Sequence, residues 1–327
     1  MIAVIDMDAI KYAAAAVGEK RTILVTHKDS GREMEFKNRT EFYGRNKKEG
    51  WLGKRNENRT SPFEVNEFEI TDIQVPEPVE NALFVAKSSL EKTKKAIGVK
   101  EHVGFVGEGE SFRVEVSTIL KYKGQRANML RPVHLDAVSD YLVTRLGAKV
   151  VTGIEADDAC VIECYGTDNV LCAIDKDAYG TPSRVFNPNH PEDGIVECDT
   201  FGKLWLNDKG QVKGYGRIFF YFQVANGDSI DNYKANSASK IKWAEKSAYN
   251  ALKDCTNDVE ARKALVGVYQ HLYPDPQQVK GWRGDMIEVD WLYMLTENFN
   301  MARMMTSYKD KFYSESDVLN WVDGKLF

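Results

Sequence analysis

Four groups of acidic residues stand out in the sequence because of their spacing. They are Asp6 with Asp8, Glu155 with Asp157 and Asp158, Asp175 with Asp177, and Asp228 with Asp231. A spacing of i, i+2 at the end of a strand puts both side chains on one side, and a spacing of i, i+3 does the same on the first turn of a helix. Each group alone would also suit a helix N-terminus or a turn, where acids are common. Their joint chemistry depends on whether the fold brings the four groups together.

Carboxylates gathered in this number would repel one another by several kcal/mol unless cations neutralised them. Carboxylate oxygens suit hard divalent ions, and none of the five histidines falls into a metal-ligand motif. We therefore expect the acids to bind two or more divalent ions, Mg²⁺ or Mn²⁺.

Basic residues follow the first acidic group at a distance along the chain. Lys123 and Arg126 lie in the sequence KYKGQR, and Arg113 lies in SFR just upstream. A phosphodiester bound at a metal gains negative charge in the transition state, and a Lys or Arg facing it provides fixed stabilisation. Alone, KYKGQR would suit a solvated charged turn. Beside the acids, Lys123, Arg126 and Arg113 become the predicted catalytic residues.

Apolar stretches typical of strands recur, and acids and then residues with helical periodicity follow them. We expect strands at 2–5, 102–106, 148–152 and 169–174, and helices at 8–17, 77–97, 133–146 and 155–165. This alternation is typical of a parallel sheet with helical crossovers, whose sites form beyond the carboxyl ends of the strands at topological switch points. Three of the acidic groups follow predicted strands, so the predicted fold brings them to one edge of the sheet.

Two regions depart from this alternation. Residues 20–76 are typical of an insertion that begins with a β-hairpin around Asp29 to Gly31. Residues 195–206 and 212–219 suit short strands, and residues 238–325 are mostly helical in pattern. We predict an α/β fold with a mostly parallel central sheet flanked by helices, an inserted β-hairpin flap and a helical C-terminal region. The expected domains are an α/β core at 1–233, with the insertion at 20–76, and a helical region at 234–327.

Composition limits the class of protein. The 327 residues are 43% hydrophobic and 28% charged, as in soluble globular proteins. No apolar run approaches the roughly 20 residues that span a membrane, and no signal-peptide pattern is visible. The five cysteines form an odd set without CxxC, so we expect reduced thiols in a cytoplasmic protein, with Cys160 and Cys164 in the core. The net charge of −5, from 44 basic and 49 acidic residues, conceals a balance of +5 once ten acids are set aside, namely the nine acids of the four groups and Glu108.

Five short motifs occur in order along the chain. They are IDMD at 5–8, YKGQR at 122–126, EADD at 155–158, IDKD at 174–177 and NGDSIDNY at 226–233. This series resembles the flap endonuclease or 5′→3′ exonuclease family of PIN-like nucleases, and most of all the bacteriophage replicative 5′→3′ exonucleases. The resemblance implies a PIN-like fold, a metal-binding and DNA-binding hydrolase of DNA replication, and a phage-encoded protein in the host cytoplasm.

The resemblance also implies roles for individual residues. The implied metal ligands are Asp6, Asp8, Glu108, Glu155, Asp157, Asp158, Asp175, Asp177, Asp228 and Asp231. Glu108 stands where the family usually has Asp, and the position of Asp8 is variable in the family. Lys123 and Arg126 match the basic residues at the base of the family's helical gateway, which contact the scissile phosphate. Only 28 residues separate Arg126 from Glu155, so any arch is short.

The segment after Asp231 departs from the family pattern. The family usually has a glycine-rich loop there that binds duplex backbone and K⁺, whereas NYKANSASKIKWAEK contains no Gly and does not favour a K⁺ site. Backbone amides among Ala235 to Ser239 could still form an anion-binding nest, with Lys234, Lys240 and Lys242 nearby. This region and Tyr122 are predicted nucleic-acid contacts.

A basic stretch at 37–59 contains eight Lys or Arg against three Glu. Its predicted nucleic-acid contacts are Arg45, Lys47, Lys48, Lys54 and Arg55. Phe42, Tyr43 and Trp51 are interleaved with them and would suit stacking against bases. The alternative is a solubilising loop whose aromatic side chains anchor it to the core.

The acidic groups predict a divalent-metal-dependent nuclease. The resemblance implies a 5′→3′ exonuclease that acts on DNA and leaves 5′-phosphate products, with flap or RNA-primer removal as further activities. Expected partners are DNA with 5′ ends, nicks or flaps. RNA:DNA hybrids and replication or single-strand-binding proteins are further candidates, and no membrane partner is expected. Two alternatives remain: a nucleic-acid-binding replication scaffold with weak or no catalysis, and a PIN-like endoribonuclease. Concentrated negative charge without metals would not help a scaffold to bind a polyanion.

Overall fold

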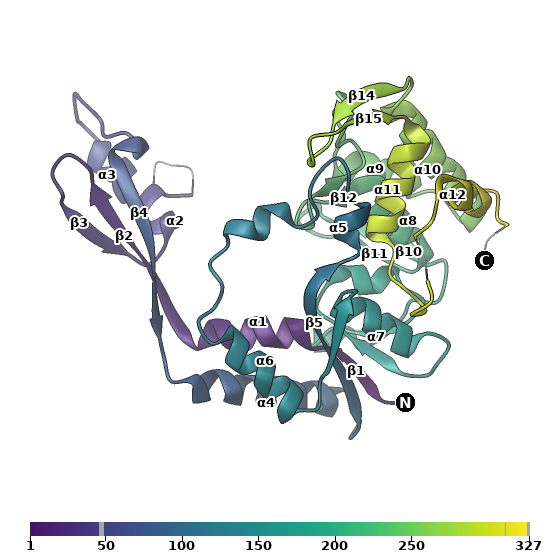
Figure 1. Cartoon of the computed structure of the whole chain (residues 1–327), viewed down its shortest axis with the longest axis horizontal. Coiled ribbons are helices and arrows are strands. Elements are labelled where there is room, and N and C mark those ends of the chain that lie inside the picture. The colour runs from purple at the N-terminus through teal and green to yellow at the C-terminus, as the bar shows by residue number, and fades with distance from the viewer. Residues whose placement is uncertain (46–48, 311, 326–327) are drawn as a thin grey trace. The chain divides into compact units, whose positions relative to one another are not determined.

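The computed structural model of the protein describes residues 1–45, 49–310 and 312–325. The chain divides into two compact units (Figure 1). The first unit contains residues 1–10, 88–130 and 142–327, and the second contains residues 11–87 and 131–141. The division runs through three helices, which are α1 (Met7–Val17), α4 (Val79–Ala96) and α6 (Leu135–Thr144).

The first unit is built on a six-stranded sheet of order β6-β5-β1-β7-β8-β9. Its strands are β1 (Ala3–Asp6), β5 (His102–Ser111), β6 (Lys149–Gly153), β7 (Val170–Cys172), β8 (Arg184–Phe186) and β9 (Ile195–Glu197). All neighbours pair in parallel except β8 and β9. The predicted α/β class, a mostly parallel central sheet flanked by helices, is confirmed. β8 was not predicted, because its three residues are too few to show a pattern.

Local signals in the sequence explain where the helices of this fold begin and end. Predicted and observed helices agree within a few residues, and α7 spans Ala156–Cys164. Gly98 and Gly147 adopt left-handed φ angles of 71° and 72° just beyond α4 and α6, as glycine permits at helix C-termini. Cys160 and Cys164 are 0% and 2% exposed in the core between α7 and the sheet, as predicted. Burial raises the pKa of both thiols.

The C-terminal helices of the first unit are α8 (Arg217–Asn226), α9 (Glu245–Leu252), α10 (Asp258–Leu272), α11 (Trp291–Ala302) and α12 (Glu315–Val322). Figure 1 shows them gathered around α8, and α9, α10 and α11 pack against it. Three small antiparallel ribbons join them: β10 (Lys203–Leu206) with β11 (Val212–Tyr215), β12 (Gly227–Asp228) with β13 (Tyr233–Lys234), and β14 (Gln277–Lys280) with β15 (Met286–Val289). These helices belong to the same compact unit as the sheet, whereas the sequence division placed a boundary after residue 233.

Helix α8 differs from the prediction of a strand at 212–219. β11 ends at Tyr215, and Gly216, with a φ of 78°, separates it from the helix. Seven of the ten residues of α8 are buried, so the stretch RIFFYFQVAN has no polar face. Helical periodicity in hydrophobicity is weak in a helix that is buried on most sides. Aromatic residues also favour strands, which explains the misleading signal.

The second unit contains the three-stranded antiparallel sheet β3-β2-β4, with β2 (Glu19–His27), β3 (Glu33–Phe36) and β4 (Phe68–Pro76). The predicted hairpin is confirmed between β2 and β3, and β4 was not predicted. Two short helices, α2 (Arg39–Tyr43) and α3 (Trp51–Asn56), precede β4. Phe42 is 0% exposed and its ring stacks on Trp51 in an aromatic core. These aromatic side chains therefore anchor the insertion, and the predicted stacking against bases is wrong for Phe42.

Short helices and turns complete the chain. They are α5 (Arg113–Val116) and the 3-10 helices at Val65–Glu67, Gly124–Asn128, Lys176–Gly180 and Pro191–Asp193. In the described ranges, no helix has the length and apolar character needed to cross a membrane.

Candidate active site

The order of the sheet explains how the acidic groups meet. The chain leaves β1 toward β5 on one side, and it leaves β7 toward β8 on the other side. The carboxyl ends of β1 and β7 therefore form a topological switch point, where parallel sheets open a crevice. Asp6 is the last residue of β1, and Asp175 follows β7 and caps the helix at Lys176–Gly180. Glu155 caps α7, which packs against β1, β5 and β7.

Electrostatic repulsion links nine acids into one cluster, named the acid cluster below. Asp6 interacts with Asp8, Asp157 and Asp175; Asp157 with Glu155 and Asp158; Asp177 with Asp175, Asp228 and Asp231; and Asp231 with Glu155. The four groups that are far apart in the sequence therefore lie close enough to repel one another.

The pKa values of the acid cluster show where its negative charge is not balanced. Burial and the charge of Asp8 raise the pKa of Asp6 to about 7, and burial with the charge of Asp175 raises the pKa of Asp177 to about 8. Burial, Glu155 and Asp158 raise the pKa of Asp157 well above its ordinary range. The basic residues of the chain thus leave part of this charge uncompensated near neutral pH. An added cation would supply the missing charge.

The carboxylates are not arranged as a preformed ligand shell. Among the described residues, no three Asp, Glu, His or Cys side chains are placed so that they could hold one metal ion. Several of the acids instead accept hydrogen bonds from basic side chains and backbone amides of the chain. The donor chemistry of the acid cluster therefore fits a hard divalent ion, while its side-chain positions are those of internal ion pairs.

The turn at 122–126 brings two of the predicted catalytic residues to the acid cluster. Lys123 forms an ion pair with Glu155, and its Nζ lies 3.9 Å from Oδ1 of Asp231. Arg126 Nη2 lies 2.9 Å from the same Asp231 oxygen. Lys123 has a left-handed φ of 51°, which is uncommon for a residue other than glycine and is often found at functional sites. Burial opposes the charge of Lys123, but Glu155 and Asp231 raise its pKa, so it stays protonated.

Arg113, the third predicted catalytic residue, does not have the predicted role. Its side chain is 2% exposed and makes a bidentate ion pair with Asp158, with N···O distances of 2.6 and 2.9 Å. The guanidinium also donates to the carbonyls of Met301 at 3.1 Å and Arg303 at 2.9 Å. Asp158 is 0% exposed and accepts a further hydrogen bond from Met305 N at 3.1 Å. The structure contradicts a substrate contact for Arg113, because its side chain is buried against Asp158. It also contradicts a metal-ligand role for Asp158, because both of its oxygens accept hydrogen bonds from the chain.

Tyr122 also differs from its predicted role. It is 4% exposed, so it cannot stack on a nucleic acid. Its hydroxyl oxygen lies 2.7 Å from Oε2 of Glu155 and 3.2 Å from Oδ2 of Asp231, so its one proton is within donating distance of both carboxylates. Burial and the charge of Glu155 raise its pKa well above its ordinary range, so the hydroxyl keeps its proton. Tyr122 therefore orients two carboxylates from different segments.

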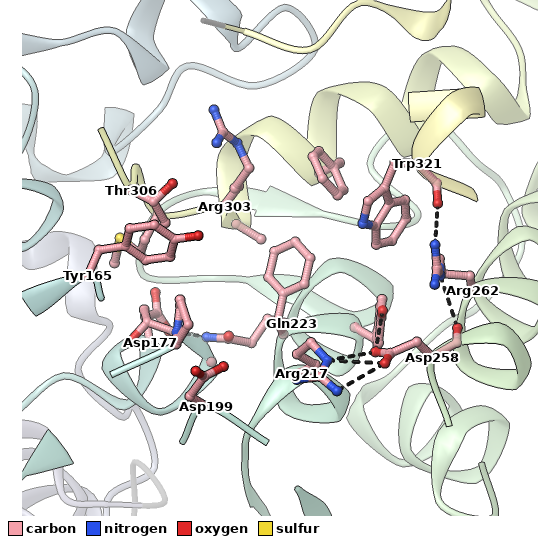
Figure 2. A pocket seen from close by; sticks show the side chains of 18 of the residues that line it. Tyr165, Asp177, Asp199, Arg217, Gln223, Asp258, Arg262, Arg303, Thr306 and Trp321 are labelled. Carbon is pink, nitrogen blue, oxygen red and sulfur yellow. Dashed lines mark hydrogen bonds and ion pairs between the residues drawn. The ribbon is translucent and has the colours of Figure 1, made fainter. Parts of the chain in front are cut away.

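Gln223 is a site residue that was not predicted from the sequence. Its Nε2 lies 2.5 Å from Oδ1 of Asp177, and it is 5% exposed on α8. Its signal was available, because it is a polar residue within the largely apolar and aromatic stretch IFFYFQVA at 218–225. Asp177 and Gln223 both line a cavity of about 590 Å³ whose other walls include Arg217, Arg303 and Trp321 (Figure 2). Asp177 therefore faces this cavity with one oxygen held by Gln223.

Other predicted site residues lie as follows. Asp8 Oδ2 accepts a hydrogen bond from Gly107 N at 3.2 Å, while Glu108 is exposed on β5. In the second unit Arg45, Lys54 and Arg55 are exposed, and Lys47 and Lys48 lie outside the described residues.

The segment after Asp231 contains the remaining predicted contacts. Lys234, Lys240 and Lys242 are exposed in it. The amides of Ser237, Ala238 and Ser239 donate to Lys234 O, Tyr273 Oη and Asn236 O. Because these amides already have acceptors within the chain, the predicted anion-binding nest is wrong for the three of them.

No protein-family model and no curated protein matches this chain. A solved structure, a crystal structure of the T5 D15 protein co-crystallized with metal ions, is similar to it. The two chains share 16% sequence identity with a TM-score of 0.37, over 74% of this chain and 82% of that one.

Proposed function

We propose that this protein is a divalent-metal-dependent 5′→3′ exonuclease that acts on DNA and releases 5′-phosphate products. One observation carries the proposal: four acidic groups from distant segments form a single cluster, with Lys123 and Arg126 at its accessible side. Side chains of these two residues are 28% and 42% exposed, so both can meet a ligand. The direction of digestion and the preference for DNA rest on the motif resemblance.

The residues that would hold a divalent ion are Asp6, Asp157, Glu155 and Asp175, because they end β1, begin α7 and follow β7, and because they interact within the acid cluster. A bound ion supplies Lewis-acid stabilisation of the phosphate and lowers the pKa of a water nucleophile. The raised pKa values of Asp6 and Asp157 are consistent with charge that such an ion would balance.

The chain's own residues perform the rest of the reaction. Lys123 and Arg126 place two positive charges where the phosphate would approach, and these charges stabilise the negative charge that develops on it. Tyr122 keeps Glu155 and Asp231 oriented toward the same point. No side chain is needed as a covalent nucleophile.

A digestion assay tests this function directly. The full chain is incubated with Mg²⁺, or with EDTA, and with 5′-labelled or 3′-labelled blunt, nicked, flap and RNA:DNA substrates. We expect Mg²⁺-dependent release of short products from 5′ ends. Binding without cleavage would instead support the replication scaffold, and cleavage of RNA alone would support the endoribonuclease.

Lys123→Ala is expected to lower turnover at saturating substrate by about 10²-fold, because a fixed positive charge that meets developing charge is worth about that much. The measurement is single-turnover cleavage with Mg²⁺. Lys121→Ala is the matched control, because Lys121 lies two residues away and is exposed. A change confined to substrate affinity would make Lys123 an ordinary phosphate contact.

Exposed basic residues of the second unit are expected to contact the nucleic-acid backbone. Each lost phosphate contact reduces the slope of log affinity against log salt by about 0.7 to 0.9. Changing Arg45, Lys54 and Arg55 together to Ala should therefore flatten the slope by about 2 to 3 units, in a salt titration of DNA binding with Ca²⁺. The control is Arg39→Ala with Asp72→Ala, which removes an ion pair without changing net charge. An unchanged slope in the triple variant would favour the solubilising-loop alternative.

A further inference from the structure

The acidic groups of the cluster differ in how the chain itself neutralises them. On the side of Asp228 and Asp231, basic side chains are in direct contact. Lys176 Nζ lies 2.6 Å from Oδ2 of Asp228, and Arg126 Nη2 lies 2.9 Å from Oδ1 of Asp231. On the side of β1 and α7, Glu155 pairs with Lys123 and Arg113, and Asp158 pairs with Arg113. Within the described part of the chain, no Lys or Arg forms an ion pair with Asp6 or Asp157. The carboxylate of Asp6 accepts a hydrogen bond from the backbone amide of Asp8 at 2.9 Å, and that of Asp157 accepts one from the amide of Asp158 at 2.7 Å.

The position of Lys176 follows from local structure. It is the first residue of the 3-10 helix that Asp175 caps, so it lies between two acids of the cluster. Its ammonium contacts a third acid, Asp228, whose side chain is only 9% exposed. The other oxygen of Asp228, Oδ1, accepts hydrogen bonds from the backbone amides of Ile230 at 2.6 Å and Asp231 at 3.3 Å. Both oxygens of Asp228 are thus engaged within the chain.

Neighbouring acids on this side are engaged as well. Asp177 is held by Gln223, and Asp231 by Arg126 and Tyr122. A divalent ion that binds Asp228 would have to displace the ammonium group of Lys176 from Oδ2 of that carboxylate. An ion at Asp6 and Asp157 would displace no basic side chain of the described chain.

We propose that the ammonium group of Lys176 takes the place of a second divalent ion at Asp228, so that the protein binds a single divalent ion, at Asp6 and Asp157. This inference rests on the proposed function, because it concerns the metal centre of the same site, and it replaces the two or more ions expected from the sequence. An ammonium group balances one charge of the carboxylates where a divalent ion would balance two. Lys176 is thereby a positioning residue for Asp228 and does not touch the reacting atoms.

The test is the stoichiometry of Mn²⁺ binding to the full chain, without nucleic acid, by equilibrium dialysis and calorimetry. We expect one ion per wild-type chain and two per Lys176→Gln chain, because the neutral amide releases Asp228 for coordination. Adding Asp228→Asn to Lys176→Gln should restore one ion. Lys176→Arg, which keeps the charge, should bind one ion.

Lys209→Gln is the matched control for the loss of one positive charge, because Lys209 is an exposed residue in the turn between β10 and β11. It should bind one ion. A second variant, Asp228→Asn alone, tests the proposal even if Lys176→Gln does not fold. Its Mn²⁺ dissociation constant should differ from that of the wild type by less than twofold, since Asp228 holds no metal while it is ion-paired with Lys176.

Two ions bound by the wild-type chain, one ion bound by folded Lys176→Gln, or a loss of Mn²⁺ affinity above tenfold in Asp228→Asn would each overturn the inference. Those results would leave the proposed nuclease function intact. Absence of Mn²⁺ binding in every variant at millimolar concentration would overturn both, and it is therefore distinguishable from failure of the inference alone.

Discussion

Asp157→Asn is expected to lower turnover by about 10²- to 10³-fold while leaving the protein at least as stable as the wild type. The amide removes a negative charge that would hold the divalent ion, and with it stabilisation of the transition state. The same change relieves repulsion from Glu155 and Asp158, which lie beside Asp157 in the acid cluster. An Asn oxygen can still accept the backbone hydrogen bond from Asp158 that the carboxylate accepts.

Two measurements on the same preparation check this result. Turnover is measured at saturating substrate and Mg²⁺, and the free energy of unfolding is measured with urea in EDTA. Glu163→Gln is the matched control, since Glu163 is also an acid on α7 but is not a member of the acid cluster. Near wild-type turnover of Asp157→Asn would contradict the metal assignment, and a large loss of stability would contradict the account of repulsion.

Arg113→Met is expected to destabilise the protein by about 3 to 5 kcal/mol, because it leaves the carboxylate of Asp158 buried without its counter-ion. The side chain of Arg113 connects α7 with the C-terminal end of α11, through Asp158 and the carbonyls of Met301 and Arg303. Urea unfolding of the wild type and the variant gives the difference in free energy. Exposed ion pairs contribute much less, so Arg184→Met, which removes the pair with Glu197, is the control.

A double-mutant cycle identifies the cause of this loss. Asp158→Asn alone should also destabilise strongly, since it leaves Arg113 buried beside a neutral partner. The variant with both Arg113→Met and Asp158→Asn should lose less stability than the sum of the two single changes, because neither charge then remains buried alone. Additive losses would show that the two side chains act independently and would contradict the ion-pair account.

Much of this site could be predicted from local sequence. The apolar stretch IAVI followed by Asp6 defines a strand with an acid at its carboxyl end, and the motif EADD defines a helix N-terminus with acids in its first turn. The alternation of strands and helices then requires a parallel sheet, and a parallel sheet brings carboxyl ends of its strands to one edge. Convergence of the acids follows from spacing and topology, and both are readable from the sequence.

Long-range packing decided the rest, because the partners of each side chain come from distant segments. Asp157 and Asp158 are neighbours on one helix, and a rotation of about 100° between them turns their side chains to different surroundings. Asp158 meets Arg113 and the amide of Met305, 147 residues away, while Asp157 interacts with Asp6 and Glu155 in the acid cluster. Adjacent acids of one motif thus differ: Asp158 has a structural role, and Asp157 is a proposed metal ligand.

The same reason applies to Lys176 and to Gln223. Neither the motif around Lys176 nor its place in a helix indicates that it contacts Asp228. That contact forms because α8, which ends just before Asp228, packs against the short helix at Lys176–Gly180. Gln223 reaches Asp177 only because α8 packs against the same short helix. The sequence by itself determined which carboxylates gather at the sheet edge, whereas only the tertiary structure decided which of them are neutralised by the chain. Neutralisation depends on distances between side chains that no local pattern encodes.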